Sequence, residues 1–334
     1  MREPAFWWRE AGLFARLLAP LGALYGAVAA QRMRRKGTRA RVPVVCVGNL
    51  TLGGSGKTPA AIAIARMLQT AGHRPVFLTR GYGGRLAGPV LVTPGHSAAE
   101  VGDEPLLLAR VAPTIVARDR VAGAAAAEKA GADIIVMDDG FQNPSLVKTM
   151  SLLVIDGLRG TGNGHVFPAG PLRAPLAAQL ARAQSLLIVG EAGASTQALV
   201  KRWRPRAPAT GRLVADPAAV TALAGRHVLA FAGIGDPEKF FATLRAAGVT
   251  IDETRGFADH HVFTAAEAAE LLGRADTARL TLVTTEKDHA RMSGNPALAT
   301  LAARTMTLPV AFTLDDADVI GPALADLLTD RRFK

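Results

Sequence analysis

The chain has 334 residues, which is longer than one small domain and suits two domains of ordinary size. Hydrophobic residues make up 49% of the sequence and charged residues 20%, so there is enough apolar side chain to bury a core. The formal net charge of +11 favours a negatively charged partner, such as nucleic acid, phospholipid headgroups or a phosphorylated small molecule. Aromatic residues are only 5% and do not alternate with the basic ones, so we expect no nucleic-acid partner.

The amino-terminal segment, residues 1–40, is apolar from Phe6 to Ala30 and basic after that. Its large apolar side chains recur at the spacing of one helix face: Phe14, Leu17, Leu18, Leu21, Leu24, Tyr25 and Val28. Six cations follow: Arg32, Arg34, Arg35, Lys36, Arg39 and Arg41. The uncharged stretch is shorter than the roughly 20 residues of a spanning helix, and Pro20 is expected to kink or restart the helix. This pattern predicts an amphipathic helix in the interface of an anionic membrane leaflet.

Two other interpretations of this segment stay open. Ala27-Val28-Ala29 is similar to the cleavage site of a secretory signal, although the nucleotide loop described next argues against export, because ATP is a cytosolic reagent. The segment also fits an amphipathic helix that packs on the protein's own core.

A glycine-rich loop follows the strand-like run at residues 42–47, in which the single cysteine, Cys46, is expected to be a small buried hydrophobe. The loop reads Gly48-Asn49-Leu50-Thr51-Leu52-Gly53-Gly54-Ser55-Gly56-Lys57-Thr58 and leads into an Ala- and Ile-rich helix. Strand, glycine-rich loop and helix in this order are typical of a phosphate-binding loop for ATP. The expected nucleotide-binding residues are Thr51, Gly53, Gly54, Ser55, Gly56, Lys57 and Thr58. Lys57 should reach the β- and γ-phosphates, and the Thr58 hydroxyl should bind Mg²⁺.

A second strand-like run, residues 132–137, ends in Asp138 and Asp139. Carboxylates at the end of a neighbouring strand are the usual partner of the Mg²⁺ on a phosphate-binding loop. We expect Asp138 to hold the metal, directly or through water, and Asp139 to share that task or orient a neighbour. Taken alone, the same residues fit a turn with two solvated acids.

Strand-like and helix-like runs alternate through the rest of the chain: strands at 75–79, 114–117, 227–231 and 280–285, and helices at 104–111, 121–129 and 237–247. This alternation predicts an α/β fold with helices on both faces of a mostly parallel sheet. We expect a P-loop ATP-binding domain at residues 41–210. A second, smaller α/β/α domain should occupy 211–334, and its C-terminal end can pack back on the first.

Several motifs together resemble the tetraacyldisaccharide 4′-kinases, which phosphorylate the lipid A precursor in Gram-negative bacteria. The matching residues are Gly48-Asn49 with the loop from Gly53 to Pro59, Arg80-Gly81-Tyr82-Gly83, Gly102-Asp103-Glu104-Pro105, the run from Asp138 to Asn143, the run from Pro168 to Arg173, Asp259-His260-His261 and Thr285-Glu286-Lys287-Asp288. They occur in the family's order over most of the chain. Thr51 also resembles the family's version of the loop, whereas Asn143 stands where the family often has His.

The resemblance implies that ATP and Mg²⁺ are used to phosphorylate the 4′-hydroxyl of an acylated glucosamine disaccharide 1-phosphate. Transfer to an alcohol needs a carboxylate that accepts the hydroxyl proton, and the resemblance implies Asp103 for that role, with His260 as its partner in a dyad. By residue type alone, Asp103 fits a helix cap and His260 a solvated loop residue. Because His260 belongs to the second domain, the two meet only if the cleft closes.

Four residues are expected to contact phosphate or the sugar ring: Arg80, Tyr82, Gln142 and Arg173. The basic loop around Arg173 fits a solvated loop equally well. The roles of Glu286, Lys287 and Asn143 stay open. The expected enzyme is a monomer, peripheral on the cytoplasmic face of the bacterial inner membrane, with the lipid A precursor and the anionic inner leaflet as partners.

The rival class is a membrane- or DNA-associated ATPase switch of the partitioning type, whose Gly-Gly-x-Gly-Lys-Thr loop is similar. That class carries a lysine just before the first glycine of the loop, where this chain has Leu52. We therefore favour the kinase.

Overall fold

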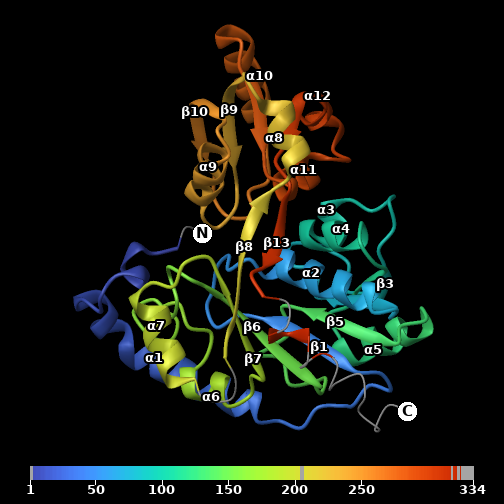
Figure 1. Ribbon diagram of the computed structural model, residues 1–334, viewed down its shortest axis with the longest axis vertical. Coiled ribbons are helices and arrows are strands. Elements are labelled where there is room, and N and C mark those ends of the chain that lie inside the picture. The colour runs from blue at the N-terminus through green and yellow to red at the C-terminus, as the bar shows by residue number, and fades with distance from the viewer. Residues whose placement is uncertain (1–2, 204–206, 317–318, 322–323, 325–334) are drawn as a thin grey trace.

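The computed structural model describes residues 3–203, 207–316, 319–321 and 324, which form two β-sheets with helices on both faces of each (Figure 1). The nine-stranded sheet has the order β13 (Val310–Leu314), β8 (Ala209–Ala215), β7 (Ser185–Val189), β6 (Met150–Asp156), β1 (Val44–Gly48), β5 (Ile134–Asp138), β2 (Pro75–Thr79), β4 (Thr114–Val116) and β3 (Val90–Leu91). Its strands pair in parallel from β8 to β4, and the two edge strands β13 and β3 are antiparallel to their neighbours. The α/β class predicted from the alternation of runs is confirmed.

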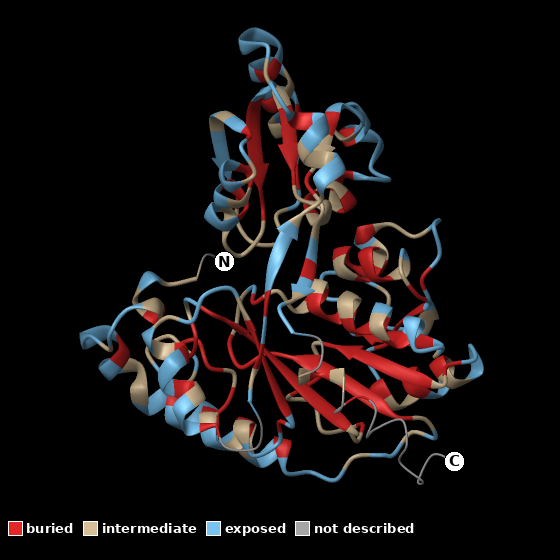
Figure 2. Ribbon diagram, in the orientation of Figure 1, coloured by how far each residue is buried: buried red, intermediate tan, exposed pale blue. Residues whose placement is uncertain are grey.

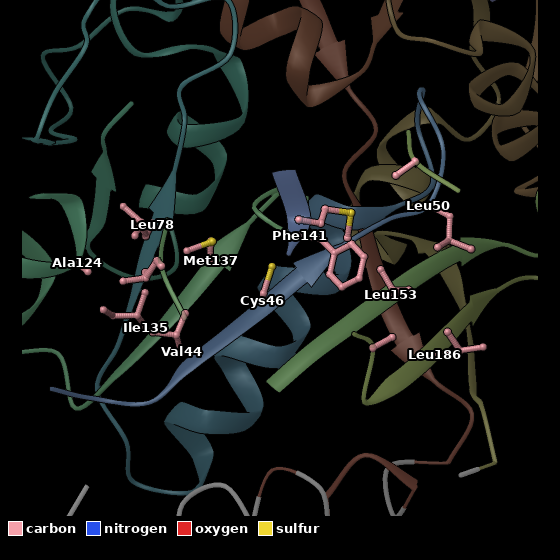
Figure 3. Close-up of a cluster of buried hydrophobic side chains, with 14 of the residues drawn as sticks. Val44, Cys46, Leu50, Leu78, Ala124, Ile135, Met137, Phe141, Leu153 and Leu186 are labelled. Carbon is pink, nitrogen blue, oxygen red and sulfur yellow. The ribbon is translucent and has the colours of Figure 1, made fainter. Parts of the chain in front are cut away.

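Helices cover both faces of this sheet. On one face, α2 (Lys57–Thr70) and α4 (Asp103–Ala109), which follows the short α3 (Ala98–Val101), contribute to one buried cluster. On the other face, α5 (Arg120–Lys129), α6 (Leu176–Leu180), α7 (Ala194–Arg202) and α1 (Leu13–Met33) contribute to a second. Figure 3 shows part of this second cluster, where Cys46, Met137 and Phe141 pack together. A Cβ at Gly48 would lie 2.4 Å from the Cβ of Phe141, so only glycine allows this close approach.

The four-stranded sheet has the order β10 (Thr250–Gly256), β9 (His227–Ala232), β11 (Thr281–Thr284) and β12 (Thr305–Thr307), with all pairs parallel. On one face lie α8 (Pro217–Leu223) and α9 (Pro237–Ala246). On the other lie α10 (Ala265–Ala278), α11 (Glu286–Met292), α12 (Ala299–Arg304) and the 3₁₀ helix η2 (Pro296–Leu298). Figure 2 shows that the central strands of both sheets are buried and that their covering helices expose their outer sides.

Two strands connect the sheets. The chain leaves the nine-stranded sheet through β8 and returns to it through β13, and these strands pair from Val310 with Ala215 to Leu314 with Gly211 (Figure 1). Residue 211, the expected start of the second domain, therefore lies inside a strand of the first sheet. The four-stranded sheet itself begins at His227.

The amino-terminal helix α1 is preceded by a 3₁₀ turn, η1 (Ala5–Trp8), and is a single helix of 21 residues. It includes Pro20, so the expected restart at this proline is wrong. Ala15 and Gly22 are buried on either side of the proline, and this packing holds both halves of the helix against the protein although the proline removes one hydrogen bond.

The large apolar residues of α1 point away from the protein: Leu13, Phe14, Leu17, Leu21, Leu24, Tyr25 and Val28 are exposed. The buried positions are Ala15, Gly22, Gly26 and Met33. A Cβ at Gly22 would lie 2.7 Å from the carbonyl oxygen of Val166, so the helix approaches the domain through small residues. By length and composition alone, α1 could cross a membrane.

Candidate functional site

The glycine-rich loop joins the carboxyl end of β1 to the first residue of α2, Lys57. Gly53 and Gly56 have φ values of 97° and 85°, a region that favours glycine, and this backbone lets successive N–H groups turn toward one side. Thr58 is buried in the first turn of α2, and the buried Ser55 hydroxyl has no hydrogen-bond partner in the part of the chain that the structure describes. The loop therefore has the form of an anion-binding nest at a helix N-terminus.

Two of the predicted substrate residues contact this loop. Arg173 donates from Nε to the carbonyl oxygen of Thr51 at 2.9 Å and from Nη1 to Asp139 Oδ1 at 2.7 Å. Gln142 donates from Nε2 to the carbonyl oxygen of Asn49 at 2.8 Å and to Gln179 Oε1 at 2.9 Å. In this structure both side chains hold the glycine-rich loop in place, and contact with a sugar stays a prediction for them.

The two adjacent carboxylates at the end of β5 have different surroundings. Asp138 is fully buried, and among the residues that the structure describes neither of its carboxylate oxygens has a hydrogen-bond partner. Burial, followed by the charges of Glu104 and Asp139, raises its pKa to about 7. Burial also acts to raise the pKa of Asp139, but Lys57 and Arg173 lower it to about 2. Asp139 is therefore an ion-paired carboxylate, whereas Asp138 is a buried one whose oxygens are unpartnered.

The unpartnered oxygens of Asp138 suit a hard cation such as Mg²⁺, which prefers oxygen ligands. In the part of the chain that the structure describes, no group of three or more His, Cys, Asp or Glu residues could hold a metal. A cation here would therefore take its other ligands from the Thr58 hydroxyl, nucleotide phosphates and water, as Mg²⁺ does on phosphate-binding loops.

Asp103, from the domain of the nine-stranded sheet, lies close to His260, from the domain of the four-stranded sheet. Asp103 is the first residue of α4 and is buried, and its Oδ2 lies 3.6 Å from Nδ1 of His260. The ring of Tyr82 lies 4.8 Å from the His260 ring, centroid to centroid. His261, the next residue, instead contacts Glu267 at 3.0 Å inside its own domain. The structure thus brings together Asp103, His260 and Tyr82, three of the predicted site residues.

Asp103 lies among positive groups. Burial acts to raise its pKa, but the neighbouring His260, Arg291 and Lys287 hold that pKa well below its usual range. The carboxylate is therefore ionised at neutral pH, which is the form that can accept a proton.

The second domain contacts α4 through α11, including the two residues whose roles the sequence left open. Lys287 donates to Glu104 at 2.5 Å, and Arg110 donates to Glu286 at 3.0 Å. Burial acts to lower the pKa of Lys287, but Glu104 and Asp103 raise it above its usual range. Both residues therefore join the domains across the cleft.

Two cations of this region were not predicted. Arg291, three residues after Asp288 on α11, contacts Asp103. Arg120 is buried at the start of α5, and its Nε has no hydrogen-bond partner. The burial of Arg120 is visible only in the structure, and the one signal in the sequence was a cation at the start of a predicted helix, where the helix dipole disfavours positive charge. Two residues that the sequence analysis named are also placed by the structure. Arg80, at the end of β2, is exposed. The side-chain oxygen of Asn143 accepts a hydrogen bond from the backbone N–H of Ser145 at 2.9 Å.

A cavity of about 450 Å³ adjoins the site. Its lining includes Glu3, Trp8, Arg159, Gly235 and Asp259, so the amino-terminal segment and both domains contribute to it. Oδ2 of Asp259 lies 3.9 Å from Nε2 of His260, which places this cavity next to the Asp103–His260 pair.

A nucleotide-type loop beside an acid–histidine pair that two α/β domains share is typical of a phosphotransferase. The family model that matches residues 14–329 is described as tetraacyldisaccharide-1-P 4′-kinase. The chain belongs to this family. The tetraacyldisaccharide 4′-kinase of Methylobacterium sp. (strain 4-46) is 57% identical over 334 residues, which cover 99% of each chain. That of Nitrobacter winogradskyi is 53% identical over 328 residues, which cover 98% of this chain and 97% of the relative.

A solved structure has the same fold. LpxK from Aquifex aeolicus, whose crystal structure was determined in complex with ATP, is 25% identical, with a TM-score of 0.71, and the match covers 95% of this chain and 100% of that one. The resemblance identified from the motifs is confirmed, and the partitioning-type ATPase is not favoured.

Proposed function

We propose that this chain is the ATP-dependent kinase that transfers the γ-phosphate of ATP to the 4′-hydroxyl of a tetraacylated glucosamine disaccharide 1-phosphate in lipid A biosynthesis. The observation that carries the proposal is the position of buried Asp103, 3.6 Å from His260, in a chain of the tetraacyldisaccharide 4′-kinase family. The relatives carry the name of this reaction, and the solved LpxK binds ATP.

The phosphate loop binds the nucleotide in this proposal. Backbone N–H groups of residues 51–56 surround the phosphates, the dipole of α2 favours their negative charge, and Lys57 reaches the transferred phosphate. Asp138 and Thr58 would hold Mg²⁺, which would supply positive charge to neutralise the negative charge that develops on the phosphate oxygens. Arg173 keeps Asp139 and the loop at Thr51 in a fixed geometry through its two hydrogen bonds.

Asp103 accepts the proton of the acceptor hydroxyl, and His260 orients Asp103 or shares the proton. Tyr82, whose ring lies 4.8 Å from that of His260 in a tilted arrangement, and Arg80 at the end of β2 supply the surface on which the sugar or its phosphate lies. Because Asp103 and His260 come from different domains, the closed arrangement assembles the base and sheds water from the transferring phosphate.

The protein acts at a membrane surface in this proposal, as a monomer. The exposed large apolar residues of α1 form a face that water solvates poorly, and six exposed cations follow at the end of the helix: Arg32, Arg34, Arg35, Lys36, Arg39 and Arg41. Such a face, next to such a cluster, suits the anionic cytoplasmic leaflet of the inner membrane. A lipid substrate held in that leaflet would then lie near the cleft.

The test is transfer of label from γ-labelled ATP to the disaccharide lipid in mixed micelles with Mg²⁺. We expect wild type to label the lipid, Asp103→Ala to abolish turnover, and His260→Ala to lower kcat about 10²-fold. His227→Gln is the matched control, because His227 is an exposed histidine of the same domain paired with Asp252. ATP hydrolysis without labelled lipid in wild type would overturn the proposal. Full turnover in His260→Ala would remove His260 from the mechanism.

A further inference from the structure

The carboxylate of Asp103 has two oxygens with different partners. Oδ1 accepts a hydrogen bond from the backbone N–H of Glu104 at 2.9 Å, within its own helix. Oδ2 faces the second domain, where Nε of Arg291 donates to it at 2.7 Å and Nη2 of the same guanidinium also contacts it. Arg291 therefore approaches this carboxylate with two nitrogens, while His260 lies at 3.6 Å.

Arg291 is itself held in a fixed frame. Its Nη1 donates to Asp288 Oδ1 and to the carbonyl oxygen of Gly233, each at 2.7 Å. Asp288 is fully buried and accepts hydrogen bonds from the backbone N–H of Gly233 at 3.1 Å and from the Thr285 hydroxyl at 2.6 Å. The side chain of Arg291 is only 9% exposed, so the guanidinium has one orientation and one face toward Asp103.

The same glycine also positions His260. The carbonyl oxygen of Gly233 accepts a hydrogen bond from the backbone N–H of His260 at 3.0 Å as well as the one from Arg291. A Cβ at Gly233 would lie 3.0 Å from both Asp288 Oδ1 and the Cβ of His261, so the position leaves little room for a side chain. Arg291 and His260, which both face Asp103 from the second domain, are thus tied to one peptide unit.

We propose that Arg291 is a positioning residue that orients the carboxylate of Asp103 across the domain junction, together with His260, when the cleft is closed. The proposal rests on the proposed function, since it assumes that Asp103 is the base. Arg291 acts through Asp103 and need not touch the lipid or the nucleotide. It also keeps the carboxylate ionised in a region that contains further charges: Lys287, Glu104 and Asp288.

Two other ion pairs cross the same junction. They make it possible to test whether Arg291 orients Asp103 or only helps to hold the two domains together. Lys287 pairs with Glu104, and Glu286 pairs with Arg110, whose side chain is 56% exposed. The Glu286–Arg110 pair joins α11 to α4 without touching Asp103. It therefore provides a control in which the domains lose one contact but the base keeps its partners.

The experiment compares wild type, Arg291→Met, Arg291→Lys and Arg110→Gln in the lipid-labelling assay, with kcat, KM for ATP and the pH profile of kcat/KM. We expect Arg291→Met to lower kcat about tenfold or more and to leave KM for ATP within about twofold, because the base loses its orientation while the nucleotide loop is unchanged. Arg291→Lys should lie between Arg291→Met and wild type, since an ammonium cannot reproduce the planar multi-nitrogen contact. Arg110→Gln should match wild type.

The pH profile distinguishes orientation of the base from a general loss of structure. Removing the positive charge next to Asp103 raises the pKa of its carboxyl, so kcat/KM of Arg291→Met should fall at a higher pH than that of wild type when the assay is acidified, and Arg291→Lys should keep the wild-type profile. Unchanged kcat in Arg291→Met, or an equal loss in Arg110→Gln, would overturn the proposal.

If Arg291→Met does not fold, Arg291→Lys decides. A kcat below wild type with the acidic limb unmoved supports the inference, and a wild-type kcat overturns it. If wild type itself does not label the lipid, the proposed function fails first, so the two failures can be told apart.

Discussion

Asp138 and Asp139 are adjacent in the chain, yet the surroundings of their two carboxylates differ. Asp139 pairs with Arg173 at 2.7 Å, whereas both oxygens of Asp138 are buried without a hydrogen-bond partner. An ionised carboxylate without partners is costly to bury, and it is retained where a cation or a substrate compensates it. The difference suits a division of labour in which Asp138 holds Mg²⁺ and Asp139 supports the loop.

We predict that replacing the two residues by asparagine has opposite effects on stability without metal and nucleotide. At pH 8, Asp138→Asn should raise the free energy of unfolding by up to about 4 kcal/mol, the linkage equivalent of a carboxyl pKa raised from 3.8 to about 7, because it removes a buried unpaired charge. Asp139→Asn should lower the free energy of unfolding, because Arg173 loses its partner. The expected loss is only about 1 kcal/mol, since the Asp139–Arg173 pair is partly exposed to water. Urea unfolding at pH 8 measures both.

The effect of Asp138 should depend on pH. Its pKa is raised from 3.8 to about 7 in the folded protein, so between these values the folded state binds more protons than the unfolded state and stability falls as pH rises. The difference between wild type and Asp138→Asn should therefore be absent near pH 4, grow through this window and level off above pH 7. A constant difference from pH 4 to pH 8 would contradict the assignment.

At the scale of elements, α1 packs on the protein in the opposite way to most helices of water-soluble domains, which turn their large apolar residues inward. Small residues face the protein and large apolar ones face outward, which is unfavourable in water because apolar surface stays exposed. A membrane interface would remove that surface from water, and the small residues let the helix lie close to the loop at Val166.

We predict that the triple variant Leu17→Gln, Leu21→Gln and Leu24→Gln binds vesicles containing anionic lipid about tenfold or more weakly in a flotation assay. Each leucine would contribute about 1.5 to 3 kcal/mol by burial in the lipid. The urea midpoint in solution should stay unchanged. The matched variant is Gly22→Val, whose side chain would meet the carbonyl oxygen of Val166. It should lower the urea midpoint, because it separates α1 from the domain. Undiminished flotation of the triple variant would show that α1 does not enter the lipid.

At the scale of the whole molecule, the two domains are joined on two sides of the cleft. On one side α11 contacts α4, and on the other Arg159 connects the amino-terminal segment to the second domain. Its guanidinium pairs with Glu3 at 2.8 Å and with Asp236 at 2.6 Å, and it lies 4.6 Å from the ring centroid of Trp8. Contacts on both sides favour the closed arrangement in which Asp103 meets His260.

We predict that Arg159→Met destabilises the protein by about 2 kcal/mol, because two partly buried carboxylates lose a shared partner. Arg212→Met is the control: Arg212 pairs with Asp315 at 3.5 Å, but its side chain is 70% exposed, so the change should stay within about 0.5 kcal/mol. Urea unfolding of both variants at neutral pH tests this. Equal midpoints for the two variants would mean that the Arg159 contacts contribute little to holding the molecule together.

Local patterns in the sequence determined the elements and the class of the fold. The strand predicted at 75–79 is β2 (Pro75–Thr79), and the helix predicted at 237–247 is α9 (Pro237–Ala246). The glycine-rich loop was recognisable for the same reason, since strand, loop and helix are contiguous and their residue types reflect local backbone geometry. The motifs in their order were sufficient to identify the family.

Only the tertiary structure decided what surrounds each of these residues. Arg291 and Asp103 are 188 positions apart, and no pattern near either one indicates the other. Periodicity located the apolar stripe of α1, but the structure shows that the stripe faces outward, because small residues at Gly22 and Gly26 provide the closer packing on the domain. These features depend on contacts between residues far apart in the chain and on which side of an element the rest of the protein lies. A local stretch of sequence specifies neither.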